Sequence, residues 1–266
     1  MRGILPFSIG AVAGAGALVY YREHRERTRL ERLGAATLET LLDAIEANDA
    51  VTGAHVRRVA AYSLILGEAA DLDDRMLRSI ERVALFHDIG KLHEALTDIF
   101  HDVGKLSPAD KLAVMTHPQR GAQVLEPLVG FYPELGTGVA AHHERWDGKG
   151  YPLGLKGKYI PFEARIVAIA DSFDAITHRR RYSHEKSFEE GTRAIAEGRG
   201  TQFDPELVDL FLSPPLLVEL ARETRKANGP KRRGRNRRRG ESQKAPDLTF
   251  RWRQPAGVSH LPGRHP

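Results

Sequence analysis

Apolar residues recur along most of this chain at intervals of three and four, which is the spacing of one face of an α-helix. The first apolar run, Ile4 to Tyr21, carries no charge, and a basic, polar stretch follows it directly from Arg22. Leucines then continue the helical spacing from Thr28 to about Ala47. The pattern predicts helical structure over both segments.

Seven later segments carry the same helical spacing: Val51–Ala70, Asp73–His87, Pro108–Val129, Pro133–Glu144, Pro161–Thr177, Phe188–Glu197 and Pro205–Phe211. Several of them start at a proline, which is favoured in the first turn of a helix because the N–H it lacks has no partner there. No sustained alternation of apolar and polar residues indicates a strand. We therefore predict an all-α fold, a bundle of helices.

The first apolar run is a candidate membrane anchor. About 20 apolar residues span a bilayer, and this run lies at the lower edge of that range. The positive charge that follows it predicts a cytoplasmic C-terminal side. We expect a single-pass anchor within residues 1–22 and a helical stalk over residues 23–46, through which two copies could associate. A signal peptide fits less well because only Arg2 precedes the run; a hydrophobic N-terminal helix of a cytoplasmic protein is the other alternative.

The net charge of +5 in 266 residues is concentrated near the C-terminus. The run KANGPKRRGRNRRR, residues 226–239, holds most of the excess, so the middle of the chain is near neutral. Residues 226–266 contain few branched apolar side chains, and such a segment cannot bury enough area to offset its chain entropy. We predict a disordered, solvated tail there, with a weak contact to anionic lipid or nucleic acid as the alternative.

Polar residues that could bind metal stand at apolar helical positions. They are five histidines and two aspartates: His55, His87, His117, His142, His143, Asp88 and Asp171. One histidine on an apolar face is ordinarily a satisfied core residue, but seven buried polar groups without a shared partner would cost several kcal/mol. The chain has no cysteine, so any metal must be held by nitrogen and oxygen. Imidazole and carboxylate suit iron, manganese, zinc or nickel, and the set is large enough for two ions.

The segments HDIGK, THPQRG, HHERWDGKGYP, RIVAIADSFDAITHRRRY and FDPELV follow one another in this order. Together they resemble the HD-GYP family, a branch of the HD phosphohydrolase superfamily, over about Ala47 to Phe211. The resemblance implies an all-helical HD domain, which we place at residues 47–225, and hydrolysis of cyclic di-GMP. With the predicted anchor, it also implies attachment to the bacterial inner membrane with the catalytic domain in the cytoplasm.

The resemblance also implies a role for each matched residue. His55, His87, Asp88 and Asp171 look like ligands of one metal, and Asp88 bridges to a second held by His117, His142 and His143. Lys91 and Asp88 are the implied catalytic residues beside the bridging oxygen. The implied substrate contacts are Lys149, Gly150, Tyr151, Pro152 and Arg180. The implied metals are iron or manganese. Two ions are implied, and not three, because Val51 stands where some members with three metals carry a glutamate.

A hydroxide between two cations is the natural nucleophile at neutral pH, because coordination lowers the pKa of water. Lys91 and Arg180 would then stabilise the charge that develops on the phosphate. Two alternatives stay open: an HD phosphohydrolase for another nucleotide or cyclic dinucleotide, and a non-catalytic receptor for cyclic di-GMP. Histidines in charged or tail contexts, such as His178, are expected to be solvated.

Overall fold

The computed structural model describes residues 7–92, 107–178 and 186–228. Arg180 and most of the predicted basic tail lie outside these described residues. Among the described helices, none combines the length and the apolar character needed to cross a bilayer. The predicted anchor starts before the first described residue, and membrane attachment stays a prediction.

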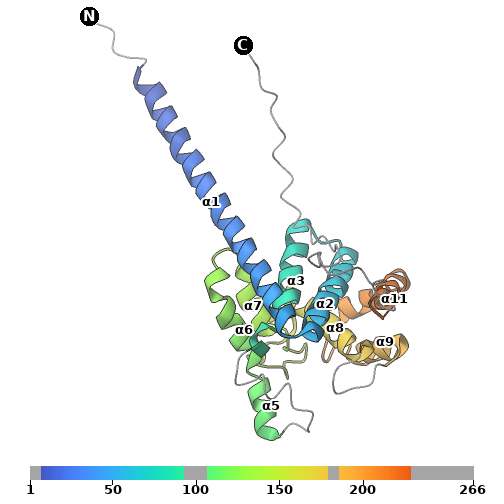
Figure 1. Cartoon of the computed structure of the whole chain (residues 1–266). Helices are drawn as coiled ribbons and strands as arrows, with labels where there is room; N and C mark the ends of the chain where they lie inside the picture. The colour runs from blue at the N-terminus through green and yellow to red at the C-terminus, as the bar shows by residue number, and fades with distance from the viewer. Residues whose placement is uncertain (1–6, 93–106, 179–185, 229–266) are drawn as a thin grey trace, which may run out of the picture. The chain divides into compact units, whose positions relative to one another are not determined.

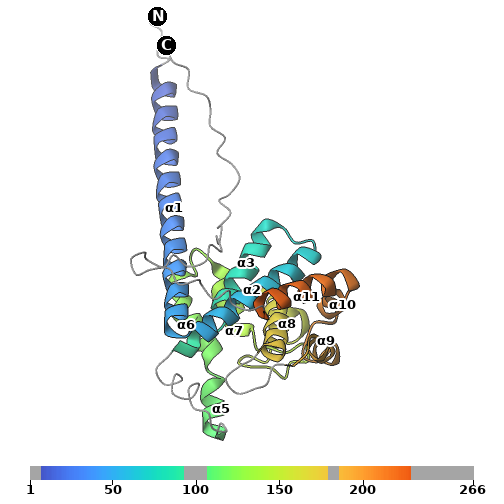
Figure 2. The same ribbon diagram turned by 45° about the vertical axis from the view of Figure 1, so that its right-hand side comes forward.

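The described residues form helices joined by short connections (Figures 1 and 2). The α-helices are α1 (Phe7–Asn48), α2 (Ala50–Ala69), α3 (Asp74–Phe86), α5 (Pro108–Val114), α6 (His117–Leu125), α7 (Pro133–Ala141), α8 (Phe162–Thr177), α9 (Phe188–Glu197), α10 (Pro205–Phe211) and α11 (Pro214–Asn228). Three short 3-10 helices are η1 (Ile89–Leu92), η2 (Glu126–Leu128) and η3 (Gly157–Tyr159). Within the described ranges the only β contact is an isolated bridge between Arg199 and Phe203. The prediction of an all-α fold is confirmed.

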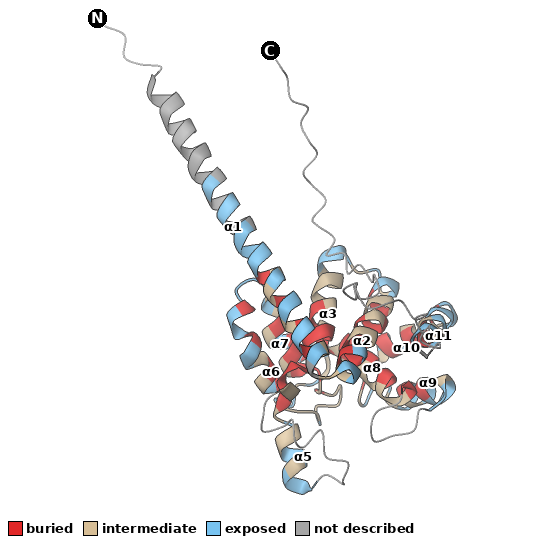
Figure 3. Ribbon diagram, in the orientation of Figure 1, coloured by how far each residue is buried: buried red, intermediate tan, exposed pale blue. Residues whose placement is uncertain are grey.

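The core lies among α2, α3, α7 and α8, which pack against one another. The red, buried faces of these helices point toward each other in Figure 3. Their largest buried side chains include Tyr62, Leu66, Ile80, Phe86 and Phe173, each less than 2% exposed. Full burial of an apolar side chain of this size contributes about 1.5–3 kcal/mol. The core therefore holds rigid the helices whose ends carry the predicted metal-binding residues.

The last turns of α1 belong to the packed domain. Leu38, Leu42 and Ile45 are buried, and α1 packs there against α2. Leu30 and Leu33, two turns earlier, are 47% and 63% exposed. Asp49 then separates the two helices by accepting a hydrogen bond from the first turn of α2 as its N-cap.

One long helix predicted over Pro108–Val129 is wrong, because the chain breaks after Val114 and starts α6 at His117. Pro118 explains the break. It has no N–H to donate to the carbonyl of Val114, and its ring would clash with that carbonyl in a continuous helix. The carbonyl of Val114 is therefore left available to another donor.

Gly90 lets η1 approach the start of α6 closely. A Cβ at this position would lie within 3.0 Å of the carbonyl of His117 and 2.6 Å from the backbone nitrogen of Gly121. Both contacts are to backbone, which cannot move aside as a flexible side chain would. Gly90 is thus needed to bring the HDIGK segment and the histidine at the start of α6 together.

We predict that Gly90→Ala lowers the free energy of unfolding by about 3 kcal/mol, at the upper end of the range for overpacking. Gly130→Ala is the matched control, because a Cβ there meets nothing within 4 Å. It should change stability by no more than about 0.5 kcal/mol. Chemical denaturation of both variants measures the difference, and equal stabilities would contradict the close approach.

Candidate metal centre

The Asp88 carboxylate lies at the centre of the predicted site, between α3 and η1, and is 4% exposed. Its Oδ2 is 3.5 Å from Nε2 of His87 and 3.7 Å from Nε2 of His55. Its Oδ1 is 3.3 Å from Nε2 of His117 and 4.0 Å from Nε2 of His142. The two oxygens of one carboxylate therefore face two separate pairs of imidazoles.

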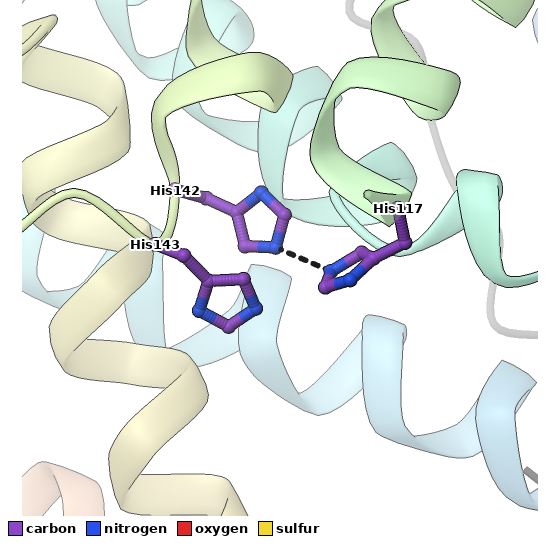
Figure 4. Close-up of side chains that lie close together, drawn as sticks. All are labelled: His117, His142 and His143. Carbon is purple, nitrogen blue, oxygen red and sulfur yellow. Dashed lines mark hydrogen bonds between the residues drawn. The ribbon is translucent and has the colours of Figure 1, made fainter. Parts of the chain in front are cut away.

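Two groups of candidate ligand atoms lie on either side of Asp88. One is formed by His55, His87 and Asp171, and the other by His117, His142 and His143; within each group the atoms are within 4.8 Å of one another. Figure 4 shows the second group, with the rings of His117 and His142 turned toward each other and their Nε2 atoms 3.2 Å apart. The structure thus brings together all seven residues predicted from the sequence as metal ligands.

Three of the imidazoles are oriented by backbone at helix ends. Nδ1 of His87, His117 and His142 lies 2.7, 2.7 and 2.6 Å from the carbonyl oxygen three residues earlier. These carbonyls belong to the last turns of α3, α5 and α7, where they have no partner within the helix. A carbonyl only accepts, so Nδ1 carries the hydrogen and the Nε2 of the neutral ring presents a lone pair toward Asp88.

The fourth imidazole is oriented by a side chain. Nδ1 of His55 lies 2.6 Å from Oδ2 of Asp174, and Nε2 of His55 faces Asp171 at 3.3 Å. Asp174 is fully buried and also receives hydrogen bonds from Arg58. Nδ1 of His178 lies 3.0 Å from Oδ1 of Asp174, and His178 is buried, so the expectation that His178 is solvated is wrong.

The interactions around Asp174 were missed in the sequence, although a signal was present. Asp174 follows Asp171 by three residues on α8, and Arg58 follows His55 by three residues on α2. Residues three apart on a helix lie on the same face. An acid and a base one turn away from predicted ligands could therefore have been recognised as their supports.

The electrostatics of the site keep Asp88 charged and keep His142 and His143 neutral. Burial would raise the pKa of Asp88, but the nearby Lys91 ammonium and His87 hold it well below its ordinary value. Burial and the neighbouring imidazoles lower the pKa of His142 well below its ordinary value. Burial lowers the pKa of His143 to about 4. For His55 burial acts in the same direction, but hydrogen bonds to two aspartates outweigh it and raise the pKa.

The residues present fit a pair of divalent cations. Nε2 of His87 and Oδ1 of Asp88 are buried without a hydrogen-bond partner among the described residues. Each such atom costs about 1–3 kcal/mol when it is left unsatisfied. Imidazole nitrogens and carboxylate oxygens are donors that divalent iron, manganese and zinc accept. His55, His87 and Asp171 would hold one ion, the other three histidines the second, and Asp88 can contact both.

A loop that follows the paired histidines covers one side of the site. Tyr151 stacks on His143, with ring centroids 4.9 Å apart and an angle of 28°. Gly150 passes so close to the preceding turn that a Cβ would lie 2.5 Å from Cα of Glu144. Pro152 follows Tyr151 through a cis peptide bond, and Lys149 is exposed. The predicted substrate-contacting loop therefore adjoins the second group of ligand atoms.

Among the described residues, Lys91 is the lysine or arginine that contacts the central carboxylate. Its Nζ lies 2.5 Å from Oδ2 of Asp88, one turn along η1. Its position beside Asp88 is the one predicted for a catalytic lysine. Arg180, the predicted phosphate contact, lies outside the described residues.

The fold and the site define an all-α protein with two clusters of histidines and aspartates that are consistent with a two-metal centre. A family model described as "HD domain" matches residues 39–207, and the chain belongs to this family. The resemblance to the HD-GYP family that the motifs indicated is thereby confirmed.

Curated relatives and a solved structure agree with this assignment. A "Cyclic di-GMP phosphodiesterase response regulator RpfG" of Xanthomonas campestris is 36% identical over 71% of this chain and 48% of its own length. A "3'3'-cGAMP-specific phosphodiesterase 2" of Vibrio cholerae is 37% identical over 65% of this chain and 33% of its own. The crystal structure of a cyclic GMP-AMP specific phosphodiesterase of Vibrio cholerae shares the fold, with a TM-score of 0.52 and 24% identity over 73% of this chain and 50% of that one. The chain thus spans a third to a half of these curated relatives.

The Glu144 side chain anchors the loop that carries Tyr151 through hydrogen bonds to its backbone. It is 3% exposed, and its carboxylate accepts hydrogen bonds from the backbone N–H groups of Leu153 and Leu155 at 2.6 and 3.0 Å. In Glu144→Gln one acceptor oxygen becomes an NH₂ group that faces a backbone donor. We predict a loss of about 1–3 kcal/mol in unfolding free energy and faster hydrogen exchange at the amides of Leu153 and Leu155.

The control for this variant is Glu219→Gln, because Glu219 is exposed on α11. It should leave both stability and the exchange of the loop amides unchanged. Hydrogen exchange read by mass spectrometry localises the effect. Unchanged exchange at the two loop amides in Glu144→Gln would show that this carboxylate does not hold the loop.

Proposed function

We propose that this chain is a metal-dependent phosphodiesterase that hydrolyses cyclic di-GMP. The observation that carries the proposal is the Asp88 carboxylate, whose two oxygens face two separate groups of metal-binding atoms. Paired cations held a few ångströms apart are a common device for phosphate-ester hydrolysis. The names of the curated relatives support a cyclic dinucleotide as the phosphate ester.

Hydrolysis adds one water molecule across a bond between phosphorus and a 3′ oxygen. The water oxygen forms a bond to phosphorus, the bond to the 3′ oxygen breaks, and a proton from the water ends on that oxygen. The chemistry that bound divalent cations supply here is a lower pKa for water and positive charge beside the phosphate.

The side chains of this chain would be in place before the reaction and would offset the negative charge that develops on the phosphate. Asp88 and the imidazoles are held before substrate arrives, so little reorganisation is needed during the reaction. The Lys91 ammonium, fixed beside Asp88, would offset negative charge that develops on the phosphate. Tyr151 and the loop around it would cover the site and limit the access of bulk water.

A second candidate substrate is 3′3′-cyclic GMP-AMP. It is favoured by the relative from Vibrio cholerae that is named for this substrate and is as similar to the chain as the one named for cyclic di-GMP. The two substrates differ in one purine, and both contain the phosphodiester bonds that a two-metal site would cleave. Both therefore belong in the same assay.

The test is hydrolysis by the purified chain loaded with Mn²⁺ or, under anaerobic conditions, Fe²⁺. We expect conversion of cyclic di-GMP to the linear dinucleotide or to GMP, and chromatography measures the products. Asp88→Asn should lower kcat by at least about 100-fold, because loss of a shared ligand exceeds the loss from an outer-shell partner. Asp204→Asn is the control, because Asp204 is as buried as Asp88 but is not one of the candidate ligands. Its Oδ2 pairs with Nη1 of Arg165 at 2.7 Å, and the variant should keep most of the activity.

Each other outcome has a definite meaning. Faster turnover of 3′3′-cyclic GMP-AMP than of cyclic di-GMP would favour the second substrate. Binding of cyclic di-GMP without cleavage, unchanged in Asp88→Asn, would overturn the proposal in favour of a non-catalytic receptor.

A further inference from the structure

We propose that Asp174 is a positioning residue that fixes the tautomer of His55 and thereby sets the affinity of the metal held by His55, His87 and Asp171. The inference rests on the proposed function, because it concerns one of the two cations invoked there. It extends that function by assigning the support of this metal to Asp174 and its partners Arg58 and His178.

His55 differs from the other imidazoles in what orients it. His87, His117 and His142 donate Nδ1–H to backbone carbonyls, which are present whatever side chains the sequence carries. His55 instead lies in the middle of α2, where the backbone carbonyls are occupied by the helix itself. Its Nδ1 lies 2.6 Å from the carboxylate of Asp174. The correct tautomer of this one ligand therefore depends on a side chain.

Both oxygens of Asp174 are held in place. Oδ1 accepts from Nε of Arg58 at 2.6 Å and lies 3.0 Å from Nδ1 of His178. Oδ2 accepts from Nη2 of Arg58 at 2.9 Å and from His55. A paired guanidinium offsets the cost of a charge that is fully buried. The carboxylate cannot rotate away from His55 without breaking a bond to Arg58.

The pairing is reciprocal between two helices. α2 supplies the ligand His55 and, three residues later, the cation Arg58; α8 supplies the ligand Asp171 and, three residues later, the anion Asp174. Each helix thus carries one predicted ligand and one charged group. Asp174 of α8 orients His55 of α2, and Arg58 of α2 holds Asp174. The geometry of this group of ligands follows from the packing of α2 on α8.

Without the carboxylate, His55 can carry its hydrogen on Nε2, where a metal would otherwise bind. An asparagine at 174 allows this, because its NH₂ group can donate to Nδ1 of His55. Loss of an outer-shell partner of this kind costs about 10–100-fold in metal affinity. Because His117 and His142 in the other group are oriented by backbone carbonyls, and none of that group is among the partners of Asp174 in the described part of the chain, the loss should fall on one metal only.

The experiment uses the full chain and Mn²⁺ as the probe. In the wild type we expect two bound Mn²⁺ per chain by calorimetry and elemental analysis, with the electron paramagnetic resonance signal of a coupled pair. In Asp174→Asn we expect one Mn²⁺ site to keep its affinity and the other to weaken by about 10–100-fold. The resonance signal should change to that of an isolated Mn²⁺ ion at Mn²⁺ concentrations between the two dissociation constants.

Asp204→Asn is again the matched control, since Asp204 is 2% exposed and paired with Arg165. It should lower thermal stability and keep two Mn²⁺ sites of unchanged affinity. Arg58→Lys is a second variant, which keeps the positive charge but loses the forked contact; it should weaken the same single site by less than about tenfold. This variant carries the test if Asp174→Asn does not fold.

Failure of this inference can be told apart from failure of the proposed function. If the wild type binds fewer than two Mn²⁺, the two-metal proposal itself fails. If the wild type binds two and both sites are unchanged in Asp174→Asn and Arg58→Lys, the positioning role is overturned and the two-metal proposal stands. Equal weakening of both sites would also overturn it, because a general loss of structure then explains the result.

Discussion

A buried negative charge, the carboxylate of Asp88, is the constraint on which the rest of this structure depends. A carboxylate taken out of water is costly unless opposite charge or hydrogen-bond donors surround it. Lys91 supplies one charge directly, at 2.5 Å from Oδ2. The nearby imidazoles present the lone pair of Nε2, which accepts hydrogen bonds and cannot donate one to Oδ1 of Asp88, so the donor atoms of the site are arranged in a way that suits bound cations.

Helix ends provide most of this arrangement. The final carbonyls of a helix need partners, and three histidines placed just after helix ends satisfy them through Nδ1. The same hydrogen bond that completes the helix end also turns Nε2 of the ring toward Asp88. Local structure and metal binding are therefore served by one contact, and Pro118 contributes by ending α5 where His117 needs a free carbonyl.

The packing around the site explains why particular small or buried residues stand in the motifs. Gly90 allows η1 and α6 to meet, and Gly150 allows the loop to pass over Glu144. Glu144 in turn binds the backbone of the loop that carries Tyr151 next to His143. Each motif residue thus has a steric or hydrogen-bonding reason for its position, beside any role in chemistry.

Helical periodicity alone was enough to determine the fold class, and the residue types in the motifs were enough to determine which six side chains gather around Asp88. Periodicity reports which face of a helix is apolar, and a metal site without cysteine needs nitrogen and oxygen donors in apolar surroundings. Both features can therefore be recognised within short stretches of the sequence. Only the tertiary structure decided the partners of those side chains. Asp174 and Arg58 are ordinary charged residues in the sequence, and although their spacing places each on the same helix face as a predicted ligand, their pairing depends on α2 packing against α8, a contact between residues more than 100 positions apart.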